Sequence, residues 1–174
     1  MGKNIKNRLE LAVTLAIKSV KIRYKNSALG FVWSLLTPLV YLAIFVTVFG
    51  SRSTGVDNYP LYVLSGLIFW NFFNTTTNQL LNSVVSSSGI LKSINVPTLI
   101  FPISAVISAL INLGLSLLPF FALMFFFGLQ VDWTSIQFFY TLLMLVCFTL
   151  GFGMLLCAFN VYFRDIGMLW QTVV

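Results

Sequence analysis

The stretch VKIRYKNSALGFVWSLLTPLVYLAIFVTVFG, residues 20–50, decides the fold of this chain. Its start carries Lys21, Arg23 and Lys25, whereas residues 31–49 carry no charge. About 20 apolar residues suffice for a helix to cross a bilayer, and a basic flank is held on the cytoplasmic side. We therefore predict a surface-lying segment that turns, at an uncharged joint formed by residues 27–30, into a first membrane span.

The composition of the whole chain supports a membrane protein. Hydrophobic residues make up 59% of the 174 residues and charged residues only 8%, a balance that excludes an ordinary soluble domain. Long uncharged runs predict helices, because barrel strands would alternate apolar and polar residues. We predict an all-α membrane protein that forms one transmembrane domain over residues 1–174, with an interfacial amphipathic helix and joint at 1–30, four transmembrane helices at 31–49, 61–83, 103–128 and 137–159, and both ends cytoplasmic.

The charge distribution indicates topology. The net charge is +6, and seven of the ten cations lie in residues 3–25, so we expect contact with lipid headgroups and no nucleic-acid partner. Lys92 and Arg164 would also lie inside, with Arg164 and Asp165 at the cytoplasmic end of the fourth span, whereas Arg52 would lie outside. The N-terminal segment also has a helical apolar stripe, which we expect to rest in the acyl boundary; its members are Ile5, Leu9, Ala12, Val13, Ala16, Val20 and Tyr24.

Polar and small residues mark faces of the later spans. One face of the second span carries amides and a hydroxyl, and facing them toward lipid would be costly. This face therefore predicts either hydrogen bonds between helices or the wall of a polar conduit; its members are Asn71, Asn74, Thr75, Asn78 and Asn82. Small residues in the third and fourth spans predict close helix packing; they are Ser104, Ser108, Asn112, Ser116, Gly151 and Gly153.

No pattern typical of an enzyme is present in the sequence. The chain has no histidine and four acidic residues spread over different segments, so neither an acid/base pair nor a metal site is expected. A phosphate-binding GxxxxGK[ST] loop is absent from the sequence. No ionisable residue falls within a predicted span, which disfavours ion-coupled transport. We predict that this chain is not an enzyme and binds no cofactor, and that any transport draws its energy from another subunit.

Four blocks of the sequence resemble one known family in order and spacing. They are KIRYKNSALGFVWSLLTPL at 21–39, YPLYVLSGLIFW at 59–70, LKSINVP at 91–97 and VYFRD at 161–165. This pattern resembles the membrane subunits of ABC type 2 exporters of polysaccharide, the permeases that export O-antigen, teichoic acid and capsule chains.

The resemblance implies a multi-pass permease of the bacterial cytoplasmic membrane. It implies a homodimer bound to two ABC ATPase subunits, which hold ATP and Mg, and a lipid-linked glycan as substrate. Residues implied to contact the ATPase are Lys21, Arg23, Lys25, Gly89, Lys92 and Asn95. Residues implied at the glycan loading point and conduit are Leu29, Gly30, Trp33 and Tyr41. Family members have two further spans beyond the Arg-Asp pair, so we expect this chain to represent part of such a subunit.

Two other functions remain open from the sequence. An ABC type 2 exporter of drugs or lipids shares the architecture and differs in cargo. A membrane scaffold without transport activity would need neither an ATPase partner nor a conduit.

Overall fold

The computed structural model describes residues 2–25, 30–50, 58–93, 97–128 and 134–174. These residues form helices and no strand, which confirms the predicted all-α class. The helices are α1 (Gly2–Lys25), α2 (Gly30–Phe49), α3 (Tyr59–Ser86), α4 (Ser88–Ser93), α5 (Ile100–Phe126), α6 (Thr134–Tyr162) and α7 (Asp165–Val173).

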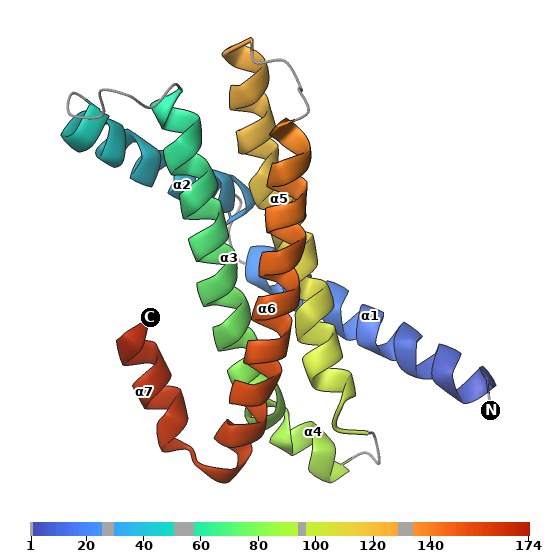
Figure 1. Ribbon diagram of the computed structural model, residues 1–174. Coiled ribbons are helices and arrows are strands. Elements are labelled where there is room, and N and C mark those ends of the chain that lie inside the picture. Colours follow the sequence, from blue (N-terminus) through green and yellow to red (C-terminus); the bar gives the residue numbers. More distant parts are fainter. Residues whose placement is uncertain (1, 26–29, 51–57, 94–96, 129–133) are drawn as a thin grey trace.

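Three upright helices form the body of the molecule. α3 packs against both α5 and α6, and α1 and α2 run obliquely across this group (Figure 1). The start of α3, the end of α5 and the start of α6 lie at one end, and α4 and the α6–α7 connection lie at the other (Figure 1). Lys92 in α4 and Arg164 after α6 therefore share one end of the bundle, as the charge distribution predicted.

Local sequence explains where α3 and α5 begin and end. α3 starts after Asn58, whose backbone has φ 55°, a conformation that asparagine tolerates better than most residues. Pro60 lies in the first turn, where its missing N–H is not needed. α5 is one continuous helix with Pro119 inside it, and it is followed by Gly128 at φ 65°, a common helix-terminating conformation.

The four predicted spans coincide with α2, α3, α5 and α6, within a few residues at each end. Among the described residues, Ile100–Phe126 and Ile136–Tyr162 are long and apolar enough to cross a membrane, and Leu36–Phe49 is a shorter apolar helix. The number of crossings and the cytoplasmic location of both ends stay predictions.

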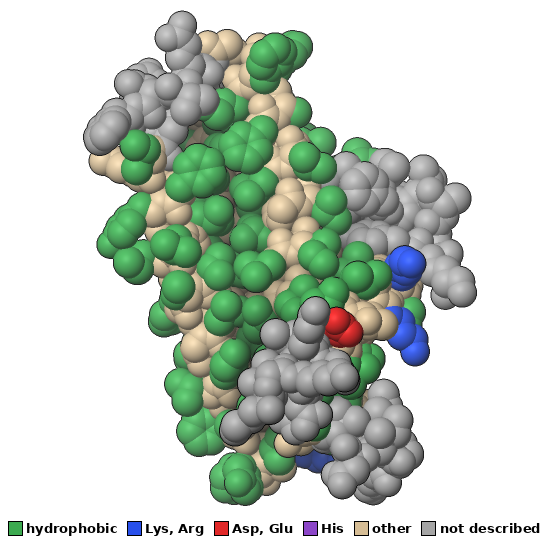
Figure 2. Space-filling model, turned by 90° about the vertical axis from the view of Figure 1, so that its right-hand side faces the viewer, with side chains coloured by type: hydrophobic (Ala, Val, Ile, Leu, Met, Phe, Trp, Pro, Cys, Tyr) green, Lys and Arg blue, Asp and Glu red, His purple; other side chains and the backbone are tan. Residues whose placement is uncertain are grey.

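The surface of the described helices is strongly apolar. Large side chains of α6 such as Phe139, Leu143 and Leu155 are more than half exposed. Figure 2 shows hydrophobic side chains over most of one face, with the few charged ones below its middle. Such a continuous apolar surface is expected of a protein that faces lipid.

Buried side chains hold the helices together in two regions. Leu42 of α2, Leu64, Ile68 and Phe72 of α3, and Ala109 and Leu113 of α5 form the hydrophobic core. On the other side of α3, Gly153 of α6 lies directly against Leu80, whose side chain is fully buried. Gly153 thus confirms the predicted close packing. Gly151 is exposed, and a Cβ added there would have no atom of a neighbouring side chain or helix within 4 Å.

α1 contacts more protein than the sequence predicted. It packs against α5 and touches α2, and Ala12 and Ala16 are buried at 1% and 0% exposure. Two members of the predicted lipid-facing stripe are therefore covered by protein. The physical reason is that alanine exposes little area to lipid but allows two helices to approach closely. Val13 and Ile17 remain exposed.

The Leu80 contact predicts different effects of valine at the two glycines of α6. A Cβ at position 153 would clash with Leu80 Cδ1 and lie 3.2 Å from Leu80 Cβ, so Gly153→Val should destabilise the protein by about 1–3 kcal/mol. Gly151→Val is the matched control and should change stability by less than about 0.5 kcal/mol. Thermal unfolding midpoints of the detergent-solubilised variants test this, and equal midpoints would show that the contact is not tight.

Candidate functional site

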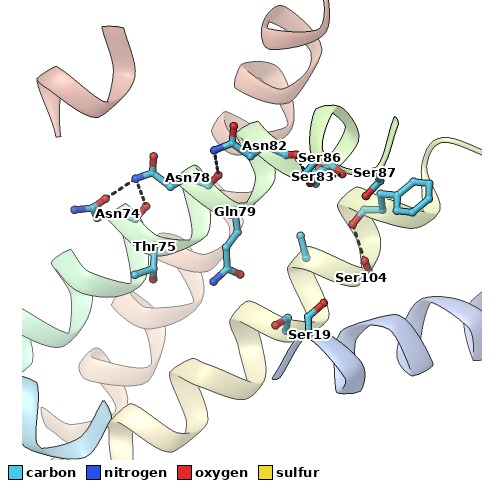
Figure 3. Close-up of a pocket in the computed structure, with 13 residues that line it drawn as sticks. Ser19, Asn74, Thr75, Asn78, Gln79, Asn82, Ser83, Ser86, Ser87 and Ser104 are labelled. Carbon is cyan, nitrogen blue, oxygen red and sulfur yellow. Dashed lines mark hydrogen bonds between the residues drawn. The ribbon is translucent and has the colours of Figure 1, made fainter. Parts of the chain in front are cut away.

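A polar cavity of about 570 Å³ lies between α1, α3 and α5 (Figure 3). It involves the C-terminal half of α3 and the N-terminal half of α5, and so lies in the half of the bundle nearer α4. None of its lining residues is charged; they are Ser19 of α1, Asn74, Thr75, Asn78, Gln79, Asn82, Ser83 and Ser86 of α3, the following Ser87, and Phe101, Ser104, Ala105 and Ser108 of α5.

A ladder of asparagines forms one wall of the cavity. Asn74, Asn78 and Asn82 recur every four residues and so share one helix face. The Asn78 side-chain nitrogen donates to the Asn74 carbonyl at 2.9 Å and to Asn74 Oδ1 at 2.6 Å, and the Asn82 nitrogen donates to the Asn78 carbonyl at 3.1 Å (Figure 3). The amide nitrogens of Asn78 and Asn82 thus donate within α3.

The hydroxyl acceptors of the wall remain available. Asn78 Oδ1 has no hydrogen-bond partner in the described part of the chain, but it is fully buried and so is not open to the cavity. The hydroxyls of Thr75, Ser86 and Ser104 donate to carbonyls of their own helices at 2.6–2.8 Å. Because each hydroxyl proton is used in this way, the oxygen lone pairs are left to accept hydrogen bonds. The wall is therefore uncharged and rich in hydrogen-bond acceptors.

The opposite side of α3 is bound to α6 and α7. The Asn160 side chain donates to the Leu81 carbonyl at 2.8 Å, and the Trp170 indole donates to Thr77 Oγ1 at 3.2 Å. Trp170 also contacts the rings of Phe73 and Phe152. α7 folds back along the bundle so that these contacts form (Figure 1). One side of α3 is therefore fixed by direct contacts, and the other side is open to the cavity.

The predicted polar face of the second span is brought together in this cavity. Asn74, Thr75, Asn78 and Asn82 line it, whereas Asn71 is exposed and does not. Of the two predicted roles, hydrogen bonding between helices is not what these amides do among the described residues, because they bond within α3. The amides instead form the polar wall of the cavity.

Several lining residues were not predicted as part of a site. Ser104 and Ser108 were predicted as a packing seam; both are buried, and they also line the cavity. Gln79 was not predicted, and its side chain makes no hydrogen bond within the part of the chain that the structure describes. In the sequence, only its position next to Asn78 pointed to Gln79. Whether the neighbouring helix stands far enough away to leave a cavity beside Gln79 cannot be read from the sequence.

Of the residues predicted at the loading point, Tyr41 is the one whose side chain the structure describes, and it lies outside the cavity lining. Tyr41 of α2 is 53% exposed and is not among the lining residues. Gly30 begins α2, but its surroundings and the side chain of Trp33 lie outside the described part. Leu29 also lies outside the described residues. Their role in glycan loading stays a prediction.

The residues predicted to contact an ATPase are at the surface where they are described. Lys21 on α1 and Gly89 on α4 are exposed, and so are Arg164 and Asp165 after α6. The side chains of Arg23, Lys25 and Lys92 lie outside the described part, as does residue Asn95. Among the residues that the structure describes, no three His, Cys, Asp or Glu side chains lie together, so no metal centre can be assigned there.

Comparison with known proteins gives a consistent result. A model of the family described as "ABC-2 type transporter" matches residues 10–174. The chain is 29% identical over 157 residues to the O-antigen export system permease protein RfbA of Myxococcus xanthus, covering 90% of this chain and 60% of that protein. It is 26% identical over 171 residues to the protein of the same name from Klebsiella pneumoniae, covering 95% of this chain and 65% of that protein.

A protein named for the export of capsule polysaccharide is also similar to this chain. The capsule polysaccharide export inner-membrane protein CtrC of Neisseria meningitidis is 20% identical over 163 residues, covering 91% of this chain and 62% of that protein. The chain thus spans 60–65% of the length of the three relatives described above.

The cavity predicts that water-borne reagents reach α3 from one side only. Gln79→Cys should react with a hydrophilic maleimide about tenfold faster than Leu80→Cys, because a thiol reacts only where water reaches it, and Leu80 is fully buried. The exposed Cys147 must first be replaced. Equal labelling rates, measured by mass shift in membranes, would show that the cavity is closed.

Proposed function

The chain belongs to the ABC-2 type transporter family, and on this premise we propose that it forms part of the membrane-spanning region of a permease subunit for polysaccharide export. The proposal is supported by relatives named for O-antigen and capsule export, which match nearly all of this chain. The sequence blocks at 21–39, 59–70, 91–97 and 161–165 support the same function. The proposed location is the bacterial cytoplasmic membrane, with a second copy of the chain completing the conduit.

The energy for export is proposed to come from a separate ABC ATPase subunit. The chain has no phosphate-binding loop, and its cavity has no charged group that could couple transport to ions. ATP and Mg would therefore bind to the partner. The substrate is proposed to be a lipid-linked glycan, and this chain would act as a transport subunit rather than as an enzyme.

The arrangement of α1 and α4 supports a route for coupling. α4 lies at the end of the bundle that carries Lys92 and Arg164, where an ATPase on the cytoplasmic side would dock. α1 packs on α5 and contributes Ser19 to the cavity. A displacement of α1 by the ATPase would therefore change the cavity and the joint before Gly30 together.

Export of polysaccharide is tested by removing the gene from its native host. We expect loss of a surface polysaccharide and accumulation of the same glycan inside the cell, with restoration by the intact gene. Quantitative labelling of surface and internal glycan measures both. Unchanged surface glycan together with altered drug tolerance or lipid distribution would instead indicate the exporter of drugs or lipids. Failure of any ABC ATPase to copurify would favour a scaffold.

Docking on α4 is tested by reversing its charge. Lys92→Glu should leave membrane insertion intact and reduce copurification of the ATPase by about threefold or more, because a reversed charge repels the complementary surface of a partner. Arg52→Glu, in the segment that the sequence predicts to lie outside, is the matched control. Equal recovery of the ATPase with both variants would reject docking at α4.

A further inference from the structure

We propose that the cavity between α1, α3 and α5, here called the amide cavity, binds uncharged sugar units of the exported glycan through their hydroxyl groups. This inference rests on the proposed function and adds a substrate contact site on α3. The residues that carry it are Asn78, Gln79 and Asn82 on α3 and Ser104 and Ser108 on α5.

The hydrogen-bonding character of the amide cavity matches a ligand that is rich in donors. Asn78 Oδ1 has no partner in the described part of the chain but is fully buried, so the acceptors open to a ligand are those of the hydroxyls and of Gln79. Thr75, Ser86 and Ser104 use their protons within their own helices and offer lone pairs. Sugar hydroxyls can donate to all of these oxygens without bringing a charge into the bundle.

The absence of charge in the lining selects the sugar over a phosphate group. Binding of a phosphate or diphosphate headgroup ordinarily requires arginine or lysine, and none of the lining residues is basic. Lys18 and Lys21 lie on α1 near Ser19, but they are exposed and not part of the lining. The cavity therefore suits the neutral glycan and not the phosphate of a lipid carrier.

The volume and the lining of the cavity also suit a sugar. Its volume of about 570 Å³ lies within the usual range of small-molecule sites, about 300–1,000 Å³. Phe101 and Ala105 add apolar surface to the lining, as the mixed character of a sugar ring requires. Gln79 has both a donor and an acceptor and makes no hydrogen bond within the described part of the chain, so it can bind a hydroxyl in either direction.

The first experiment measures export by the intact transporter in its native host. The variant Asn78→Leu/Gln79→Leu removes two amides from the cavity and should lower the rate of surface glycan appearance about tenfold, the change that corresponds to losing two hydrogen bonds. Copurification of the ATPase should be unchanged. Asn71→Leu is the matched control, because Asn71 is an exposed amide on the same helix outside the cavity, and it should export normally.

The second experiment detects the glycan in the cavity directly. Gln79→Cys, with the exposed Cys147 replaced, should be labelled by a hydrophilic maleimide about fivefold more slowly in a host that makes the glycan than in one that cannot. Cysteine at position 71 should be labelled equally in both. This measurement also covers the case in which the double leucine variant fails to fold.

The outcomes separate this inference from the proposed function. If the parent transporter exports no polysaccharide, the proposed function fails. If the parent exports, but the double variant exports normally or Gln79→Cys is labelled equally with and without glycan, the sugar site is rejected. Complete protection in both hosts would also reject it, because protein, such as a second copy of the chain, would then fill the cavity.

Discussion

The structure depends on the two unlike sides of α3. In an apolar environment a polar side chain needs a partner or water, and the C-terminal half of α3 carries more amides and hydroxyls than α6 and α7 cover. On one side, Asn160 and Trp170 bond to α3, and Gly153 lets α6 approach Leu80 closely. The remaining polar groups gather on the other side, where α5 and α1 stand far enough away to leave a cavity. The same helix therefore anchors the bundle and lines its polar space.

Much of the helical framework could be predicted from the sequence. An uncharged run long enough to cross a bilayer can satisfy its backbone only as a helix, so α2, α5 and α6 follow from length and composition. The sequence also predicts the break between α3 and α5, because the serines and glycine at 86–89 and Pro97 disfavour a continuous helix. The polar face of α3 could be recognised from its spacing of four residues, and most of its predicted members do line the cavity.

Distances between helices could not be predicted in this way. Glycines 151 and 153 look equivalent in sequence, but only Gly153 lies against another helix. Ser104 and Ser108 have the spacing of a packing seam and are buried, but that spacing did not show that they also border a cavity. The burial of Ala12 and Ala16 against α5 was missed because alanine is equally compatible with lipid and protein. Each of these outcomes depends on the partner across the gap, which periodicity within one helix does not identify.

The uncharged character of the cavity has a consequence for transport. A polymer that passes through a membrane must be bound at each position and also released, so no single contact can be very strong. Each neutral hydrogen bond to the ligand replaces one to water and so contributes only about 0.5–1.5 kcal/mol net to binding. A buried charge paired with a ligand would hold it far more tightly. A wall of amides and hydroxyls such as that of α3 gives many weak, similar contacts. Directed movement along such a wall then has to be imposed from outside it, which is consistent with a permease that leaves ATP hydrolysis to a partner subunit.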